Sequence, residues 1–265
     1  MIGIGIVTYN DLIQRSQDGS PDIFEVTCDL IETISMFTED EFVIIIRDND
    51  SIDYRYKNFH VTLNNARFKN INTVFISSMV NELTDAWNEI LTTGFDHYNC
   101  EAMVLLNNDV IVTKYWQNYI NAIKVQSRDL LGPLTDSAPY QPLQNLVEEA
   151  FIEEHSLLSV PVIQGFCIGG SRRAFKENMY DEIHYFDPEI EWAFNEEEWL
   201  GRNTASGGRS LLVMNSYVIH MNAATWLQRT LLSTKTPEYI IKNQDKLVIS
   251  DILSYNDYIE GKCSV

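Results

Sequence analysis

Short apolar runs alternate with amphipathic helical patterns through the first half of the chain, and this alternation restricts the fold more than any other feature. Buried strands are expected at residues 2–7, 42–46, 73–76 and 102–106. Between them lie helical stripes, one that follows Ser20-Pro21-Asp22 and one that runs from Val80 to Leu91. Because strands that alternate with helices in this way tend to pair in parallel, the sequence predicts an α/β fold with a mainly parallel central sheet flanked by helices.

Local signals refine this outline. Ser20 is expected as the N-cap of the first helix, Pro21 as its first residue and Asp22 as an acid in its first turn. Further helix faces are expected at residues 115–123 and 143–151, and Gly132-Pro133 is typical of a strand that ends in a turn. With no internal repeat, no linker-like segment and a tail of helical patterns, we expect one compact domain and a helical C-terminal extension.

The charge of the chain is strongly negative and limits its partners. There are 38 Asp and Glu against 19 Lys and Arg, which gives a net charge of −19 at pH 7. Because a surface of that sign repels a phosphate backbone, we expect no nucleic-acid partner. No apolar run approaches the roughly 20 residues that cross a bilayer, and residues 1–7 lack the features of a signal peptide. The four cysteines are scattered without a C-x-x-C pair, which favours reduced thiols and a soluble, cytoplasmic protein.

Three of the predicted strands are followed directly by clusters of polar residues. The clusters are Thr8-Tyr9-Asn10, Arg47-Asp48-Asn49-Asp50-Ser51 and Asn107-Asn108-Asp109. Turn formation alone favours such residues and accounts for any single cluster. Parallel sheets bind ligands beyond the carboxyl ends of their strands, so three clusters at one edge indicate a polar binding site.

Familiar motifs for phosphate binding and covalent catalysis are missing from the sequence. Gly3-Ile4-Gly5 lies before and inside the first strand and lacks the third glycine of a dinucleotide fingerprint, and no P-loop pattern occurs. No G-x-S-x-G elbow is present, and no serine or cysteine has an evident base. What remains is a carboxylate-rich site without basic phosphate ligands.

A nucleotide diphosphate bound to so acidic a protein needs positive charge from another source, and a divalent cation held by carboxylate and imidazole supplies it. Asp109 is one candidate ligand, because an ionised carboxylate directly after a buried strand is costly unless it faces water or a cation. His220, which follows Val218 and Ile219, is the second, although a hydrogen-bonded core histidine would give the same pattern. Oxygen ligands with one imidazole favour Mn²⁺, or Mg²⁺, over zinc.

Taken in order, these residues give the sequence a resemblance to the family 2 glycosyltransferases of the GT-A fold, especially their rhamnosyltransferase-like branch. The resemblance covers about residues 1–226 and rests on the order and spacing of several weak motifs. They are Thr8-Tyr9-Asn10; Asp48 to Ser51 in place of D-N/D-G-S; Asn81 with Ala86-Trp87-Asn88; Leu106 to Asp109 as a D-x-D-like element; Leu131-Gly132-Pro133; Gly165 to Arg173 with Phe175; Phe186-Asp187; Glu196 to Arg202 in place of the E-D motif; and Val218-Ile219-His220. The sequence departs from the family pattern at Asn107, which replaces the first aspartate of D-x-D, and at Asp50, where glycine is usual.

The resemblance implies a GT-A, or nucleotide-diphospho-sugar transferase, fold with a nucleotide-binding half at 1–109, an acceptor half at 110–226 and the extension at 227–265. It implies an inverting, metal-dependent transfer of a sugar from a nucleotide-diphosphate donor to a hydroxyl of a glycan or glycoconjugate. The residues that would contact the donor are Thr8, Tyr9, Asn10, Asp48, Asn107 and Asn108, with Gly169 in the glycine segment 165–170 under the donor sugar.

The resemblance also implies a carboxylate that acts as the general base. Alignment on the acidic pair gives this role to Glu197, and alignment on Arg202 gives it to Glu196; we favour Glu197. Glu198 lies four residues before Arg202, so an ion pair on a helix surface explains it.

Two other functions stay open at this point. A nucleotidyltransferase that makes a nucleotide-sugar has a similar sheet, but it needs basic groups around a triphosphate, and residues 10–14 offer none. A binding module for carbohydrate or protein that keeps the fold without turnover is consistent with Asn107 and with the irregular acidic motif.

Overall fold

A computed structural model describes residues 1–9, 22–136, 138, 141–145, 156–190 and 195–221. The elements follow in the order β1 (Ile2–Thr8), α1 (Ile23–Phe37), β2 (Phe42–Asn49), α2 (Tyr54–Lys57), α3 (Phe59–Leu63), β3 (Thr73–Ser78), α4 (Leu83–Thr92), η2 (Thr93–His97), β4 (Ala102–Asn107), β5 (Val110–Val112), α5 (Trp116–Val125), β6 (Leu130–Thr135), η3 (Pro142–Gln144), β7 (Leu157–Val160), β8 (Cys167–Ser171), α6 (Arg172–Glu177), α7 (Asn195–Ala205) and β9 (Ser210–His220). Asn10, the C-terminal extension at 227–265 and most of the helix predicted at 143–151 lie outside the described residues.

The strands form one sheet in the order β3-β2-β1-β4-β8-β6-β9-β5, with β7 added on β9. Strands β1 to β4 pair in parallel, as the sequence predicts, and β8 runs antiparallel to β4. The carboxyl ends of β1, β2 and β4 therefore meet at one edge of the sheet, which places the three predicted polar clusters together.

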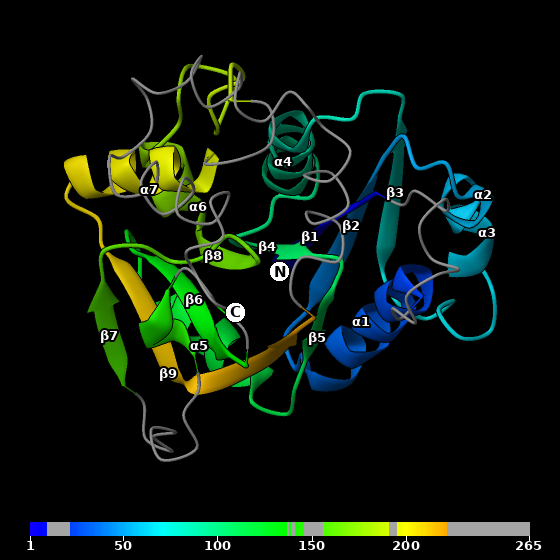
Figure 1. The fold of residues 1–265 in the computed structure, drawn as a ribbon, viewed down its shortest axis with the longest axis horizontal. Coiled ribbons are helices and arrows are strands. Elements are labelled where there is room, and N and C mark those ends of the chain that lie inside the picture. Colours follow the sequence, from blue (N-terminus) through cyan, green and yellow to red (C-terminus); the bar gives the residue numbers. More distant parts are fainter. Residues whose placement is uncertain (10–21, 137, 139–140, 146–155, 191–194, 222–265) are drawn as a thin grey trace, which may run out of the picture.

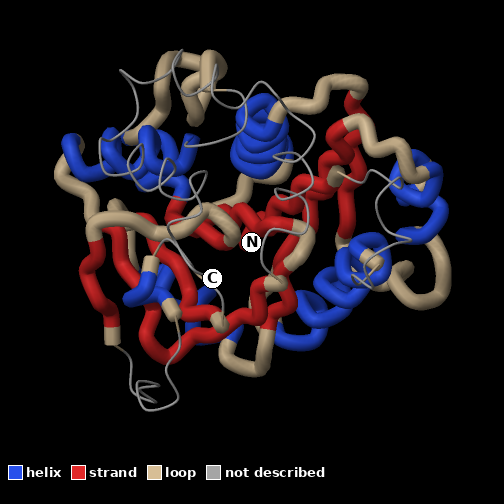
Figure 2. Tube along the Cα trace, viewed as in Figure 1, coloured by secondary structure: helices blue, strands red, loops and turns tan. Residues whose placement is uncertain are grey.

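Helices cover both faces of this sheet (Figures 1 and 2). Apolar residues of α1 and α5 pack into one core cluster, and those of α4, α6 and α7 pack into another. The pleat of β1 sends Ile4 and Ile6 to the α1 side and Val7 to the α4 side, because successive side chains of a strand alternate between faces. In the described residues no helix combines the length and apolar character that a membrane span requires.

The glycines of Gly3-Ile4-Gly5 serve packing inside β1. A Cβ added at Gly5 would lie 2.3 Å from Cγ2 of Ile90 on α4, and one added at Gly3 would lie 2.1 Å from Sδ of Met103 on β4. The missing side chains allow α4 and β4 to approach the first strand closely. This agrees with the conclusion from the sequence that the pair is not part of a dinucleotide fingerprint.

Strand β9 is long and curls the sheet. Its first residues pair in parallel with β6, the register then jumps from Pro133↔Val213 to Leu134↔Tyr217, and its last residues pair antiparallel with β5 (Figure 1). Helix α5 contacts the irregular part of β9, where the side-chain amide of Asn118 donates a 2.8 Å hydrogen bond to the carbonyl of Asn215. The bend carries the end of β9 beside β5, at the carboxyl end of β4.

Some local predictions were wrong. Helix α1 begins at Ile23 with Asp22 as its N-cap, because the Asp22 carboxylate accepts a 3.1 Å hydrogen bond from the Phe24 amide. Strand β6 continues through Gly132 and Pro133 and does not turn there. Pro133 fits within it because it stands at the register jump, where a missing amide hydrogen costs no regular ladder bond.

Candidate functional site

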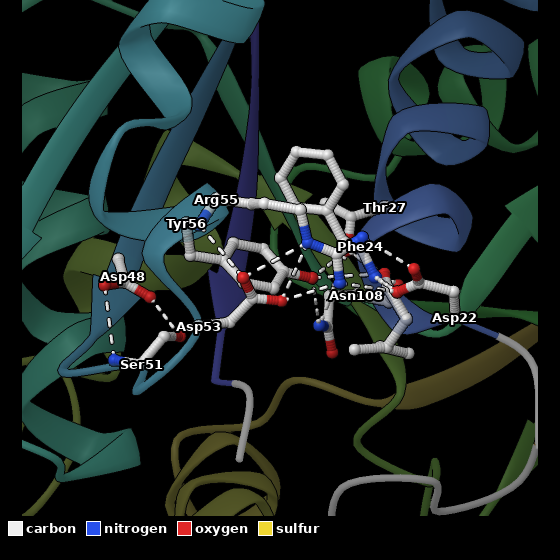
Figure 3. A network of polar contacts seen from close by, with 10 residues as sticks. Asp22, Phe24, Thr27, Asp48, Ser51, Asp53, Arg55, Tyr56 and Asn108 are labelled. Carbon is white, nitrogen blue, oxygen red and sulfur yellow. Dashed lines mark hydrogen bonds and ion pairs between the residues drawn. The ribbon is translucent and has the colours of Figure 1, made fainter. Parts of the chain in front are cut away.

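Thr8 and Asp48 form the first part of the site at neighbouring strand ends. They are direct partners in the β1–β2 register, and the Thr8 hydroxyl donates a 3.2 Å hydrogen bond to the Asp48 carboxylate. The amide of Ser51 donates to the same carboxylate at 3.3 Å, and so does the Ser51 hydroxyl (Figure 3). Burial raises the pKa of Asp48, although these hydrogen bonds oppose the shift. The carboxylate is thus held in one orientation at the edge of the sheet.

Arg47, beside Asp48, points to the opposite face of the sheet. Its guanidinium is 1% exposed and forms ion pairs with Asp85 and Glu89 of α4, the second at 2.8 Å. It also donates to Ser78 at 3.0 Å and to the carbonyl of Val80 at 3.2 Å. Because its charge is neutralised by two carboxylates, Arg47 does not supply the positive charge that a bound diphosphate requires.

Asp109 and His220, the two candidate metal ligands, lie close together. Asp109 sits in the turn between β4 and β5, and the antiparallel register of β5 with β9 pairs Val110 with His220. The amide of Met221 closes the arrangement with a 2.9 Å hydrogen bond to the Asp109 carbonyl. As a result, Asp109 Oδ1 lies 3.6 Å from His220 Nε2, and both side chains are nearly buried, with 3% and 4% of their surfaces exposed.

The geometry of this pair fits a shared divalent cation. Asp109 Oδ1 is buried and accepts no hydrogen bond from the described residues, which is costly for a carboxylate oxygen unless a cation compensates it. Adjacent ligands of an octahedral cation, each about 2.1 Å from it, lie roughly 3 Å apart, so a shift of a few tenths of an ångström lets both atoms bind. No cluster of three or more His, Cys, Asp or Glu occurs within the part of the chain that the structure describes.

Phe166 supports the imidazole of His220. The two rings stack with centroids 4.5 Å apart and planes inclined by 20°. Phe166 also accepts a 2.9 Å backbone hydrogen bond from the amide of Asn107, which ties the start of β8 to the end of β4. The stack leaves the edge of the imidazole, with its two nitrogens, to make polar contacts.

The start of α7 brings one acidic residue to this segment. A Cβ added at Gly165 would lie 2.4 Å from Oε1 of Glu196, so the Glu196 carboxylate packs directly on the residue that precedes Phe166. Glu197, the next residue, is partly exposed and has one carboxylate oxygen buried. Glu198 pairs with Arg202 at 2.7 Å, as expected for an i,i+4 ion pair. The Glu196 carboxylate is thus placed beside the segment that carries Phe166.

The other residues predicted to contact the sugar donor differ in their burial and in the elements that they face. Asn107 ends β4 and is partly exposed, Tyr9 follows β1 and is partly buried, and Asn108 is buried with its amide directed towards α1 and α2. Gly169 lies inside β8, where a Cβ would meet Ile123 at 2.5 Å and the Tyr119 hydroxyl at 2.9 Å. Core packing is therefore sufficient to explain glycine at this position.

Two contributions to the site were missed from the sequence. Phe166 stacks on His220, and Asp136, directly after β6, accepts a 2.9 Å hydrogen bond from the His220 amide. Asp136 could have been found by the same rule that found the other clusters, because it is a carboxylate at the carboxyl end of a strand. No local pattern marks Phe166, since its contact depends on the path of β9.

Comparisons with known proteins bear on the fold. No protein-family model matches the sequence, and no curated protein shows significant similarity to it. Among solved structures, GalNAc-T7 with UDP, GalNAc and Mn²⁺ superposes on 83% of this chain with a TM-score of 0.60 and 13% identity. The mannosyltransferase PcManGT from Pyrobaculum calidifontis, in complex with GDP-Man and Mn²⁺, superposes on 90% with a TM-score of 0.59 and 11% identity. TarS of S. aureus superposes on 82% with a TM-score of 0.54 and 14% identity.

The chain spans only part of these neighbours, 43% of GalNAc-T7, 59% of the TarS structure and 66% of PcManGT. At such low identities the likeness establishes shared architecture alone. The curled α/β sheet with helices on both faces, together with these neighbours, identifies the fold of this chain as the GT-A type found in glycosyltransferases.

Proposed function

We propose that this chain transfers a sugar from a nucleotide-diphosphate donor to an acceptor hydroxyl of a glycan or glycoconjugate, with Asp109 and His220 holding a divalent cation. The observation that carries the proposal is the 3.6 Å approach of Asp109 Oδ1 to His220 Nε2. The pair lies where a GT-A sheet presents the carboxyl ends of its strands, which is the usual ligand-binding edge of an α/β sheet.

The charge balance around the site supports a metal-dependent reaction. The chain carries a net charge of −19, and Arg47, the neighbour of Asp48, is turned away from the site and neutralised by Asp85 and Glu89. A bound Mn²⁺ or Mg²⁺ supplies the positive charge that stabilises a departing diphosphate. Asp48, with Thr8, Tyr9 and Asn107, lies at the neighbouring strand ends, where a nucleoside would be held. Among the neighbours, the names of two include Mn²⁺ with UDP or with GDP-Man, which makes UDP- and GDP-sugars the first donors to test.

The proposed reaction is a single displacement with inversion at the anomeric carbon. A carboxylate of α7 takes the proton of the acceptor hydroxyl, the acceptor oxygen forms a bond to the anomeric carbon, and the bond from that carbon to the diphosphate oxygen breaks. The nucleoside diphosphate leaves with the bonding electron pair. The contact of the Glu196 carboxylate with Gly165 supports Glu196 as the base in preference to Glu197, which the sequence had favoured.

The test measures release of nucleoside diphosphate from UDP-, GDP- and dTDP-sugars, with a CMP-sugar, which would release CMP, as a fourth donor. The reactions contain Mn²⁺ or EDTA, and chromatography quantifies the released nucleotide. We expect slow hydrolysis of one donor without acceptor, loss of this activity with EDTA, and at least 100-fold lower activity in Asp109→Asn. Asp96→Asn is the matched control, because Asp96 is half-exposed and pairs with Lys176 ahead of β4, away from the carboxyl ends.

The alternatives give different products. Pyrophosphate released from a nucleoside triphosphate and a sugar phosphate would establish a nucleotidyltransferase and reject the proposal. Donor binding that raises the melting temperature without any turnover would establish a binding module instead.

A further inference from the structure

Two buried hydroxyl groups, those of Thr27 and Tyr56, contact the D-x-D-like turn at Asn108. Asn108 lies between Asn107 and Asp109 and is 4% exposed. Its side-chain amide donates to the hydroxyls of Thr27 at 3.5 Å and of Tyr56 at 3.4 Å (Figure 3). Its carbonyl lies 3.5 Å from the Thr27 hydroxyl. The side chain of Asn108 therefore contacts both hydroxyls, and its backbone carbonyl contacts that of Thr27.

These hydroxyls are themselves fixed within the core. Thr27 on α1 and Tyr56 on α2 are both fully buried, and their oxygen atoms lie 2.7 Å apart. Each also reaches the carbonyl of Ile23, at 2.8 Å from Thr27 and 3.1 Å from Tyr56. The ring of Tyr56 packs edge-on against Phe24 and Phe59. The pair is thus a rigid support with little freedom to follow a moving turn.

The position of this support matters because the turn joins two differently paired strands. Strand β4 pairs with β1 and β8, whereas β5 pairs with β9, so the chain changes direction at Asn108 and Asp109. Asp109 follows the anchored residue directly, and its carboxylate faces His220. Fixing the backbone at Asn108 therefore limits the directions in which the Asp109 carboxylate can point.

We propose that Thr27 and Tyr56 are positioning residues for the cation site: through Asn108 they orient Asp109 towards His220. This inference rests on the proposed function, in which Asp109 and His220 hold the metal. Partners that orient a metal ligand typically change metal affinity or activity about 10- to 100-fold when they are removed. A purely structural role for the two hydroxyls would lower stability and leave the affinity of the folded protein for the metal unchanged.

The test uses Tyr56→Phe, which removes only the hydroxyl and keeps the packed ring. Its matched control is Tyr119→Phe, because Tyr119 is also fully buried and its hydroxyl donates a 2.7 Å hydrogen bond to the Leu131 carbonyl. Thr27→Val is the second variant, with Thr33→Val as its control, since Thr33 bonds the Leu30 carbonyl at 3.1 Å on the same helix. For each full-length protein, Mn²⁺ affinity is measured by electron paramagnetic resonance of the free ion, and stability is measured by urea unfolding.

We expect the dissociation constant for Mn²⁺ to rise about 10-fold or more in Tyr56→Phe and Thr27→Val and to stay within about twofold in the two controls. Stability should fall to a similar extent in variant and control. If the unaltered protein binds Mn²⁺ and both Tyr56→Phe and Thr27→Val bind it with the same affinity, this inference is overturned and the proposed function is not. An equal loss of Mn²⁺ affinity in the controls would have the same consequence. Failure of the unaltered protein to bind Mn²⁺ would overturn the proposed function, and the inference with it. If Tyr56→Phe does not fold, Thr27→Val decides the outcome.

Discussion

Replacement of Gly165 by alanine is a local test of which carboxylate acts as the base. The new Cβ would lie 2.4 Å from Oε1, 2.7 Å from Cδ and 3.1 Å from Cγ of Glu196. Such distances are too short to persist, so one partner must move. Gly165 is not among the described glycines with positive φ, and alanine is therefore tolerated by its backbone. The flexible side chain of Glu196 yields first, and its carboxylate leaves its present position.

The magnitude follows from the role of the displaced group. General-base assistance contributes typically 10²- to 10⁴-fold, or about 2.7 to 5.5 kcal/mol of activation free energy. We expect kcat of Gly165→Ala to fall by a factor within this range, close to the factor by which Glu196→Gln lowers kcat. Donor binding should stay nearly constant, because the lost contact acts only in the transition state. The free energy of unfolding should change by no more than about 1 kcal/mol, because the entropic gain from alanine offsets part of the cost of moving Glu196.

The assay is sugar transfer under saturating donor, with unfolding in urea measured in parallel. Gly201→Ala is the matched control on the same helix as Glu196, since a Cβ at Gly201 meets nothing within 4 Å. Full turnover in Gly165→Ala combined with a large loss in Glu197→Gln would refute the assignment to Glu196. Full turnover in both Glu196→Gln and Glu197→Gln would refute the assignment of the base to this acidic motif.

Three further predictions concern stability. Burial raises the pKa of Asp48, so the folded protein holds this proton more tightly than the unfolded chain, and stability is lost as pH rises from 3.8 through the folded pKa. In urea unfolding, the free energy of unfolding of Asp48→Asn should rise relative to that of the unaltered protein as pH increases across that window. A difference between the two proteins that does not change with pH would contradict this. Arg47→Met should lower the free energy of unfolding by about 2 to 4 kcal/mol. The loss is limited because Asp85 and Glu89, which lose their partner, are half-exposed and can be solvated. A loss below about 1 kcal/mol would mean that the ion pairs do not form. Glu198→Gln should cost about 1 kcal/mol or less and leave transfer intact, and a strong loss of turnover would assign Glu198 to the reaction.

Local patterns were sufficient to predict the elements of the first half. Residues 2–7, 42–46, 73–76 and 102–106 all lie in strands, although each of the four strands continues into the polar residues that follow it. Their parallel order followed from the alternation with helices, and so did the meeting of Thr8, Asp48 and Asp109 at one edge. Such patterns are reliable because each depends on burial within a short window of the chain.

The second half depended on contacts that no short window contains. Strand β6 passes through Gly132-Pro133 only because the register with β9 jumps there, and β9 reaches β5 only because it bends. His220 was selected from the sequence for its chemistry, but its approach to Asp109 is a consequence of the pairing of Val110 with His220.

The sequence by itself determined the α/β class, the polar strand ends and the candidate ligands, because hydrophobic period and residue chemistry are properties of neighbours along the chain. Tertiary structure alone decided that Phe166 stacks on His220, that Glu196 lies on Gly165 and that Thr27 and Tyr56 support Asn108. These contacts join residues far apart in sequence, and their geometry depends on strand register and helix packing across the whole domain.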